Sequence, residues 1–332
     1  MKRCGAIFLS AVLLLLSLSG CAAPARPPER ETPAAFTWDP HTDSAYLEEY
    51  MGQERLERYH SWVDALLAGE ERVPCDDWED LDVLTGTLRA TFPPFTALVE
   101  DYSMDEEGVV LTYTGTPEER EALLTAFAGR METLVEASVR EGDTPLMAAL
   151  ALYHDFAASV VYDEAGMEDN YEGDLSTYQG IMEGTGICQT FAPAWAYLAM
   201  AVGLDCIGVG GLDDVEENAH DWAAFRLDGE DFFADPTFEN GEGGQGLRYF
   251  GMTADQRAAS GYPLENVSVG WNMADGGDLH HLTDPRFAPL WEAAQVQEIR
   301  RPGENMELDC LDDRGDQFTL VITPDNQVDL KQ

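Results

Sequence analysis

Three side chains with complementary chemistry follow one another in the second half of the chain: the thiol of Cys188, the imidazole of His220 and the carboxylate of Asp235. A cysteine attacks a carbonyl carbon as the thiolate, so it needs a neighbouring group that accepts its proton and stabilises its charge. An imidazole does both, and a carboxylate that hydrogen-bonds the imidazole holds its tautomer and stabilises the imidazolium. Each residue alone is as readily explained by packing in a core. Together they predict a thiol nucleophile.

An apolar helix has to position this thiol. Cys188 directly precedes a run in which large apolar residues recur at helical spacing: Phe191, Ala194, Trp195, Leu198 and Val202. At the start of a helix, the unpaired N–H groups and the positive end of the dipole favour a thiolate. The N–H of Cys188 also qualifies as one donor to an oxyanion. The sequence does not single out a second donor among Gln189, Tyr178 and Gln179.

A hairpin has to position the imidazole and the carboxylate. Asp228-Gly229 separates two strand-like runs, 219–227 and 231–235, and this dipeptide favours a two-residue turn. With that turn, the last residue of the first run faces Glu230 and the whole register is set.

The predicted register brings two of the reactive side chains together. It places Trp222 opposite Asp235 and His220 opposite Thr237. Opposed residues share one face of a sheet, and so do residues two apart along a strand. His220 and Asp235 are therefore expected to be diagonal neighbours on one face. A slip of one residue would put them on opposite faces.

Three ordered motifs resemble the transglutaminase-like superfamily. They are the Gly-x-Cys within 178–192, the segment His220-Asp221-Trp222, and the segment Asp235-Pro236-Thr237 after two phenylalanines and an alanine. The resemblance extends over roughly residues 145–250 and includes the helix expected over 145–163, which ends in Tyr-Asp.

The resemblance implies a fold and roles for individual residues. The fold would be α+β with a papain-like core, in which the nucleophile helix packs on an antiparallel sheet. Cys188 would be the nucleophile, His220 the general base and Asp235 the group that orients the imidazole. Thr190 and Phe238 stand where the family often has Gly and Trp, which bears on substrate fit more than on the chemistry.

Three functions are compatible with these residues. The first is a thiol peptidase or amidase that forms a thioester at Cys188 and releases the acyl group to water, acting on peptides or proteins, cell-wall peptides included. The second is a protein-glutamine transamidase, in which an amine resolves the same thioester. The third is a surface binding module that keeps the fold without catalysis.

The first residues predict export and anchoring. Lys2 and Arg3 precede an apolar run over 6–16, which is too short to span a membrane comfortably, so residues 1–20 are expected to be a signal peptide. Leu18-Ser19-Gly20-Cys21 resembles the lipobox of bacterial lipoproteins, which implies cleavage before Cys21 and a lipid on its thiol. The other reading is an ordinary signal peptide with an incidental cysteine. A proline-rich tether would follow over 21–37.

Composition excludes several partners. The chain has 63 Asp plus Glu against 19 Lys plus Arg, a formal net charge of −44. Such a field repels nucleic acid and anionic lipid, so the lipid anchor is the only membrane contact expected. The chain shows no Cys-x-x-Cys pair and no regular calcium loop, and we expect no cofactor or metal. If Cys188 stays free, at most one disulfide is possible among Cys75, Cys206 and Cys310.

The rest of the chain divides into a lead-in and an extension. Residues 38–144 are expected to be mostly helical, with a helix start at Thr116-Pro117 and a strand at 109–113. Residues 145–250 would form the core, in which 164–185 is expected to be a loop. Residues 251–332 would be a C-terminal extension that contains a hairpin with its turn at 312–315.

Overall fold

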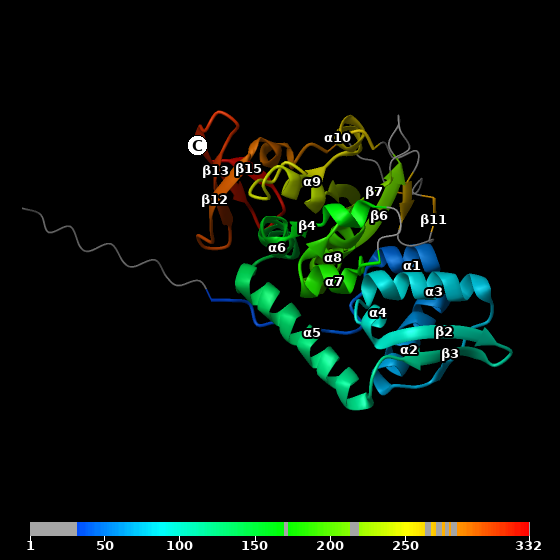
Figure 1. The fold of residues 1–332 in the computed structure, drawn as a ribbon. Coiled ribbons are helices and arrows are strands. Elements are labelled where there is room, and N and C mark those ends of the chain that lie inside the picture. The colour runs from blue at the N-terminus through cyan, green and yellow to red at the C-terminus, as the bar shows by residue number, and fades with distance from the viewer. Residues whose placement is uncertain are drawn as a thin grey trace, which may run out of the picture. The chain divides into compact units, whose positions relative to one another are not determined.

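The fold is α+β, and its central sheet has six antiparallel strands (Figure 1). The strand order in this sheet is β11-β10-β6-β7-β8-β9. The strands are β6 (Cys206–Leu212), β7 (Ala219–Leu227), β8 (Glu230–Ala234), β9 (Phe250–Met252), β10 (Val267–Val269) and β11 (Ala274–Asp275). Helix α8 (Cys188–Ala201) packs against β6 and β7. The predicted fold class, α+β with the helix that begins at Cys188 packed on an antiparallel sheet, is confirmed.

The computed structural model describes residues 32–168, 172–212, 219–262, 267–269, 274–275, 279 and 284–331. The predicted signal peptide, Cys21 and the tether as far as residue 31 lie outside these ranges. The described residues belong to one compact unit that begins at Thr32, and the boundaries expected near residues 145 and 250 remain predictions. Every helix within the described ranges is too short or too polar to traverse a lipid bilayer.

Helices account for much of the remaining chain. They are α1 (Ala45–Met51), α2 (Gln53–Ala68), α3 (Trp78–Thr91), α4 (Phe95–Leu98), α5 (Pro117–Ser138), α6 (Pro145–Ser159), α7 (Thr177–Met182), α9 (Pro236–Gly241), α10 (Ala254–Ala259) and the 3-10 helices η1 (Glu164–Met167) and η4 (Ala288–Glu292). The helix start predicted at Thr116-Pro117 is confirmed, because Thr116 forms a capping box with Glu119. The helix expected over 145–163 begins as predicted, with Thr144 as its cap, and ends at Ser159.

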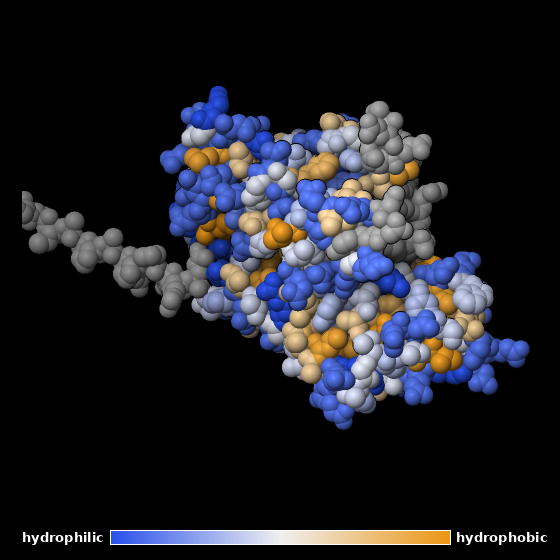
Figure 2. All heavy atoms as spheres, viewed as in Figure 1, coloured by the Kyte–Doolittle hydropathy of each residue, from blue (hydrophilic) through white to orange (hydrophobic). Residues whose placement is uncertain are grey.

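Buried apolar side chains link the helices to the sheets. The largest cluster joins α6 and α8 to the central sheet and to the C-terminal strands, with Tyr153, Trp195, Phe225 and Leu320 among its members. A second cluster fills the N-terminal region around Trp62. On the face seen in Figure 2, hydrophilic residues cover most of the surface and apolar residues form separate patches.

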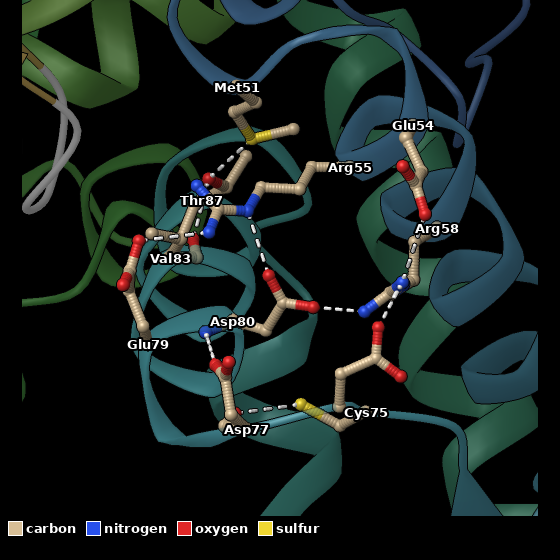
Figure 3. A network of polar contacts seen from close by, with 11 residues as sticks. Met51, Glu54, Arg55, Arg58, Cys75, Asp77, Glu79, Asp80, Val83 and Thr87 are labelled. Atoms are coloured by element: carbon tan, nitrogen blue, oxygen red, sulfur yellow. Dashed lines mark hydrogen bonds and ion pairs between the residues drawn. The ribbon is translucent and has the colours of Figure 1, made fainter.

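The N-terminal region is helical, as predicted, with one small sheet. Strands β1 (Arg72–Val73), β2 (Val99–Asp105) and β3 (Gly108–Tyr113) pair in the order β1-β3-β2, and β3 is the strand expected at 109–113. A polar network ties α2 to α3 (Figure 3). The carboxylate of Asp80, which is 6% exposed, accepts hydrogen bonds from Arg55 and Arg58. A buried carboxylate needs such partners, so this network fixes α3 relative to α2.

The hairpin between β7 and β8 has the predicted turn and register. Asp228 and Gly229 both have positive φ, 55° and 81°, as a two-residue hairpin turn requires. The pairs run from Leu227 opposite Glu230 to Ala223 opposite Ala234.

The predicted pairing is wrong beyond Ala234, where β8 ends. Asp235 is the N-cap of α9 and Pro236 is its first residue, so Thr237 is helical and does not lie opposite His220 in the ladder. Proline lacks the N–H that a ladder needs and suits the first turn of a helix, which explains why the strand stops there.

The segment predicted as a loop over 164–185 contains η1 and α7. The Ser176 side chain caps α7, and Gly180 of α7 lies so close to α8 that a Cβ there would be 3.0 Å from Ala194 and Thr190. The packing of α7 against α8 therefore supplies the stability that so short a helix lacks alone. Strands β4 (Val161–Tyr162) and β5 (Thr185–Gly186) bracket the segment as a parallel pair.

The C-terminal extension contains the predicted hairpin as part of a larger sheet. Its strands are β12 (Gln295–Arg300), β13 (Met306–Leu311), β14 (Gln317–Ile322) and β15 (Val328–Leu330), in that spatial order. Cys75, Cys188, Cys206 and Cys310 are all free, so no disulfide forms among these described cysteines.

Candidate functional site

The thiol of Cys188 lies at the first residue of α8 and is 9% exposed. A close approach of backbone and side chain fixes this helix start. A Cβ on Gly186 would lie 2.5 Å from the Cβ of Thr190, so only glycine fits there. The Thr190 hydroxyl donates to the carbonyl of Leu175 at 3.0 Å and accepts the N–H of Ile187 at 3.4 Å. Thr190, a departure from the family pattern, thus anchors the helix start to the preceding loop.

The imidazole of His220 comes from β7 and is 6% exposed. Its Nε2 lies 2.7 Å from Oδ2 of Asp235, and Cys188 is close enough to contribute to the raised pKa of the ring. Because Asp235 occupies Nε2, Nδ1 is the ring nitrogen that remains for the thiol. The ring stacks on Phe238, with ring centroids 4.5 Å apart. The ring of Tyr262 is tilted against it, with centroids 4.9 Å apart. The three residues predicted to act together are therefore brought together.

The carboxylate of Asp235 is fully buried and is held from several directions. Its Oδ1 accepts the N–H of Phe238 at 2.9 Å as the cap of α9. Its Oδ2 accepts from His220 and also from Nη1 of Arg257, each at 2.7 Å. Its backbone carbonyl accepts the hydroxyl of Tyr153 at 2.9 Å. These contacts leave the carboxylate little freedom to rotate.

Arg257 is a site residue that the sequence reasoning missed. It lies on α10, is fully buried, and its guanidinium carbon is 4.6 Å from the ring of Trp222, 5.1 Å from Phe238 and 5.3 Å from Tyr262. Its Nε and Nη2 have no hydrogen-bond partner among the described residues, where Asp235 and the three aromatic faces stabilise the buried charge. The short helix around it carries no motif that would have drawn attention to it.

Burial and charge set the protonation of the His220–Asp235 pair. Burial lowers the pKa of His220, but the charge and hydrogen bond of Asp235, reinforced by Cys188, raise it to about 9. Burial raises the pKa of Asp235, but His220, Arg257 and the N–H of Phe238 together hold it below its usual value. At neutral pH the pair is therefore an imidazolium and a carboxylate beside the thiol.

Two further acids near the His220–Asp235 pair have raised pKa values. Burial raises the pKa of Glu239 to about 7, although the N–H of Tyr249 and the hydroxyl of Tyr153 donate to it at 3.0 and 3.3 Å. Burial also raises the pKa of Asp221 to about 6. The local negative charge around Asp235 therefore decreases as the pH falls through this range.

The four groups considered as oxyanion donors differ in their hydrogen-bond and packing partners. As the first residue of α8, Cys188 has an N–H with no acceptor within the helix. Tyr178 stacks on Phe127 with centroids 5.7 Å apart, and the backbone N–H of Gln179 donates to Ser176. Gln189, the residue after Cys188, lines a pocket of about 340 Å³. No group of three or more metal-ligating side chains occurs among the described residues.

Comparison with known families identifies the region that carries this site. The family model described as transglutaminase-like superfamily matches residues 132–236. That segment, which includes Cys188, His220 and Asp235, is thus a transglutaminase-like domain. Comparison with the curated proteins gives no match.

Three solved structures show distant similarity. A provisionally assigned cysteine protease from Cytophaga hutchinsonii is 20% identical over 27% of this chain and 30% of its own, with a TM-score of 0.23. Calcium-bound LapG from Legionella pneumophila is 18% identical over 50% of this chain and 87% of its own, with a TM-score of 0.29. A TGase is 18% identical over 50% of this chain and 49% of its own, with a TM-score of 0.28. The chain spans less than two thirds of the first and third of these structures.

Proposed function

We propose that this protein is a thiol enzyme that cleaves or transfers an amide acyl group through a thioester at Cys188. The observation that carries the proposal is the contact of one imidazole with both partners. His220 is 2.7 Å from a buried carboxylate, and the thiol of Cys188, at a helix start, interacts with the same ring and raises its pKa. An imidazolium held in this way is the counter-ion that a thiolate nucleophile needs.

The proposed reaction uses these three residues in sequence. The thiolate of Cys188 attacks the carbonyl carbon, and the backbone N–H of Cys188 donates to the developing oxyanion. As the C–N bond breaks, the His220 imidazolium gives its proton to the leaving amine, and a thioester remains. Neutral His220 then takes a proton from the second nucleophile, whose attack breaks the C–S bond and restores thiolate and imidazolium. Asp235 keeps the ring oriented throughout.

Water or an amine can resolve the thioester, and the same residues serve both outcomes. Release to water makes the protein a peptidase or amidase, which is the function we propose. Incubation with peptides or proteins and a labelled amine distinguishes the two. New amino termini or free ammonia without label indicate hydrolysis, whereas label on glutamine indicates transamidation.

The reactivity of Cys188 tests the proposal before a substrate is known. At pH 6 an ordinary thiol, with a pKa of about 8.5, reacts slowly with iodoacetamide. We expect Cys188 to react much faster than free cysteine, with the modified site identified by mass spectrometry. The other described thiols are suitable internal controls, because burial raises the pKa of Cys75, Cys206 and Cys310, the last to about 12. A Cys188 that labels no faster than free cysteine contradicts the proposal and supports a binding module.

We further propose that the enzyme works outside the cell, anchored by a lipid on Cys21. The support is the apolar run that ends at Leu18-Ser19-Gly20-Cys21 and the tether that follows it. The wild type should begin at Cys21 and incorporate labelled fatty acid, whereas Cys21→Ala should incorporate none. A wild type that carries no lipid would contradict the anchor.

A further inference from the structure

A pocket of about 340 Å³ opens beside the nucleophile helix, between two parts of the chain that are distant in sequence. One wall comes from the N-terminal region, with Arg89 of α3 and Thr96 of α4. The other comes from residues 173–177 and from Gln189, which directly follows Cys188. Figure 1 shows α7 beside α3 and α4, and α3 contacts α8. The pocket therefore shares Gln189 with the first turn of the helix that begins at Cys188.

Arg89 is the cation of this pocket, and it is unlike the other cations of the protein. Every other arginine and the lysine in the described part of the chain donate hydrogen bonds to a carboxylate or a backbone carbonyl. Arg89 makes no such bond among the described residues. Its guanidinium instead lies 5.9 Å from the ring of the buried Phe95. Within the described residues of this chain, whose net charge is −44, a cation that donates to neither a carboxylate nor a backbone carbonyl is an exception.

The position of Arg89 is set by the fold. Arg89 lies in the last turn of α3, and the network around Asp80 ties α3 to α2 (Figure 3). The opposite wall is also fixed, because Ser176 caps α7 and the carbonyl of Leu175 accepts the hydroxyl of Thr190. The pocket is thus a concavity with fixed walls, and on one side lies a guanidinium that has no hydrogen-bond partner among the described residues.

We propose that this pocket is a substrate subsite that binds a carboxylate of the peptide substrate through Arg89. A guanidinium offers two parallel N–H donors that match a carboxylate, and this match is selective for an anion over its neutral amide. The remaining polar lining, from Thr96, Thr177 and Gln189, supplies groups able to bond peptide amides. Because Gln189 of the first turn of α8 lines the pocket, we expect the bound carboxylate to belong to a residue near the scissile amide.

Asp174 sets a limit on the charge that the pocket accepts. Its carboxylate also lines the pocket, and its Oδ1 accepts the N–H of Ser176 at 2.8 Å. A substrate group with several negative charges would therefore be repelled, whereas a single carboxylate at Arg89 is compatible with Asp174 across the pocket. The subsite is expected to prefer one glutamate or aspartate, or a free carboxyl terminus.

This inference rests on the proposed function, so the test separates the two. The probes are two blocked tripeptides that differ only in a central glutamate or glutamine. Each is used to protect Cys188 from iodoacetamide, and the half-protecting concentration is compared. We expect the glutamate peptide to protect at about tenfold lower concentration, which corresponds to about 1.4 kcal/mol. The preference should weaken as salt is added.

Two variants assign the preference to Arg89. Arg89→Gln should abolish the difference between the two peptides, each compared with the unprotected rate of labelling of the same variant. Arg314→Gln removes the same charge from an exposed turn between β13 and β14 and should keep the preference. Equal protection by both peptides, no protection at any soluble concentration, or a preference that survives Arg89→Gln would overturn the subsite.

A second readout does not depend on the thiol. Binding to the folded state raises the melting temperature, so the glutamate peptide should stabilise the wild type and fail to stabilise Arg89→Gln. If Cys188 is inert but this difference is present, the proposed function fails and the subsite stands. If Cys188 is reactive and the difference is absent, the subsite alone fails.

Discussion

Removal of the Arg257 guanidinium is expected to weaken both the fold and the protonation balance of the site. Arg257 and Asp235 are each fully buried, and their side chains meet at 2.7 Å. Breaking such a pair by removing one partner costs about 3–5 kcal/mol, because the other charge stays buried. His220 remains bonded to the same Oδ2, so we expect Arg257→Gln to lie near the lower end, about 3 kcal/mol in the free energy of unfolding.

The same substitution has a chemical signature that simple loss of stability lacks. Arg257 lowers the pKa of Asp235, so its removal should raise that pKa. The imidazolium–carboxylate pair would then form only at higher pH, and the acid limb of Cys188 alkylation should move upward. Urea unfolding and the pH dependence of iodoacetamide labelling measure the two effects.

Arg226, on the hairpin of β7 and β8 that also carries His220, provides a matched control. Arg226 bonds the buried Asp231 and does not contact His220 in the described structure, so Arg226→Gln should lower stability without moving the acid limb. Arg257→Lys should restore part of the effect, since it keeps the charge but loses the planar contact with the aromatic rings. An Arg257→Gln protein with unchanged stability and an unchanged acid limb would refute the reasoning.

Three further predictions follow from the same region. The raised pKa of His220 implies a contribution of about 3 kcal/mol to the free energy of unfolding. This contribution is complete below pH 6.5 and is lost as the pH rises through about 9. In urea unfolding, His220→Gln should therefore lose less stability over this pH range than the wild type. An equal decline in that variant would contradict the assignment. The raised pKa of Glu239 likewise implies a contribution to stability that is present below pH 4.5 and is lost as the pH rises through about 7. Glutamine has no charge to bury, so Glu239→Gln should be about 3 kcal/mol more stable than the wild type at pH 8. A variant less stable than the wild type at that pH would show that the carboxylate is needed. Gly186→Ala should cost about 1–3 kcal/mol because its Cβ would meet Thr190 at 2.5 Å, and Thr190→Gly should relieve part of that cost in a double-mutant cycle. Additive effects in the cycle would contradict the clash.

The parts of the fold that the sequence predicted correctly depend on local chemistry. Asp228-Gly229 fixed a turn because both residues tolerate positive φ, and the turn then fixed the register of β7 with β8. Thr116 was recognisable as a cap because a proline and two acids follow it. The helix that starts at Cys188 was recognisable from the spacing of its apolar residues.

One error in the register could have been avoided. Asp235 is followed directly by Pro236, and an acid before a proline is a helix start as well as a strand end. The expected diagonal contact between His220 and Asp235 nevertheless exists, because the cap of α9 begins where the strand stops and keeps the carboxylate beside the ring.

The missed elements depend on long-range packing. Helix α7 is six residues long and is stable through its contact with α8. Arg257 becomes a site residue only because α10 folds back onto Trp222 and Asp235. Arg89 reaches the pocket because α3 contacts α8, although some one hundred positions separate it from Cys188 in the chain. The residues around Arg257 and Arg89 in the sequence form no motif that predicts either role.

The protonation of His220 is the measurement that tests the central claim most directly. The imidazole signals can be followed by NMR against pH, with His220→Gln used for assignment. The account predicts that His220 stays protonated up to about pH 9. In Cys188→Ala its pKa should fall, because the thiol contributes to the rise, and it should remain raised through Asp235. A His220 that titrates near 6.5, or that does not respond to loss of the thiol, would contradict an imidazolium held between Asp235 and Cys188.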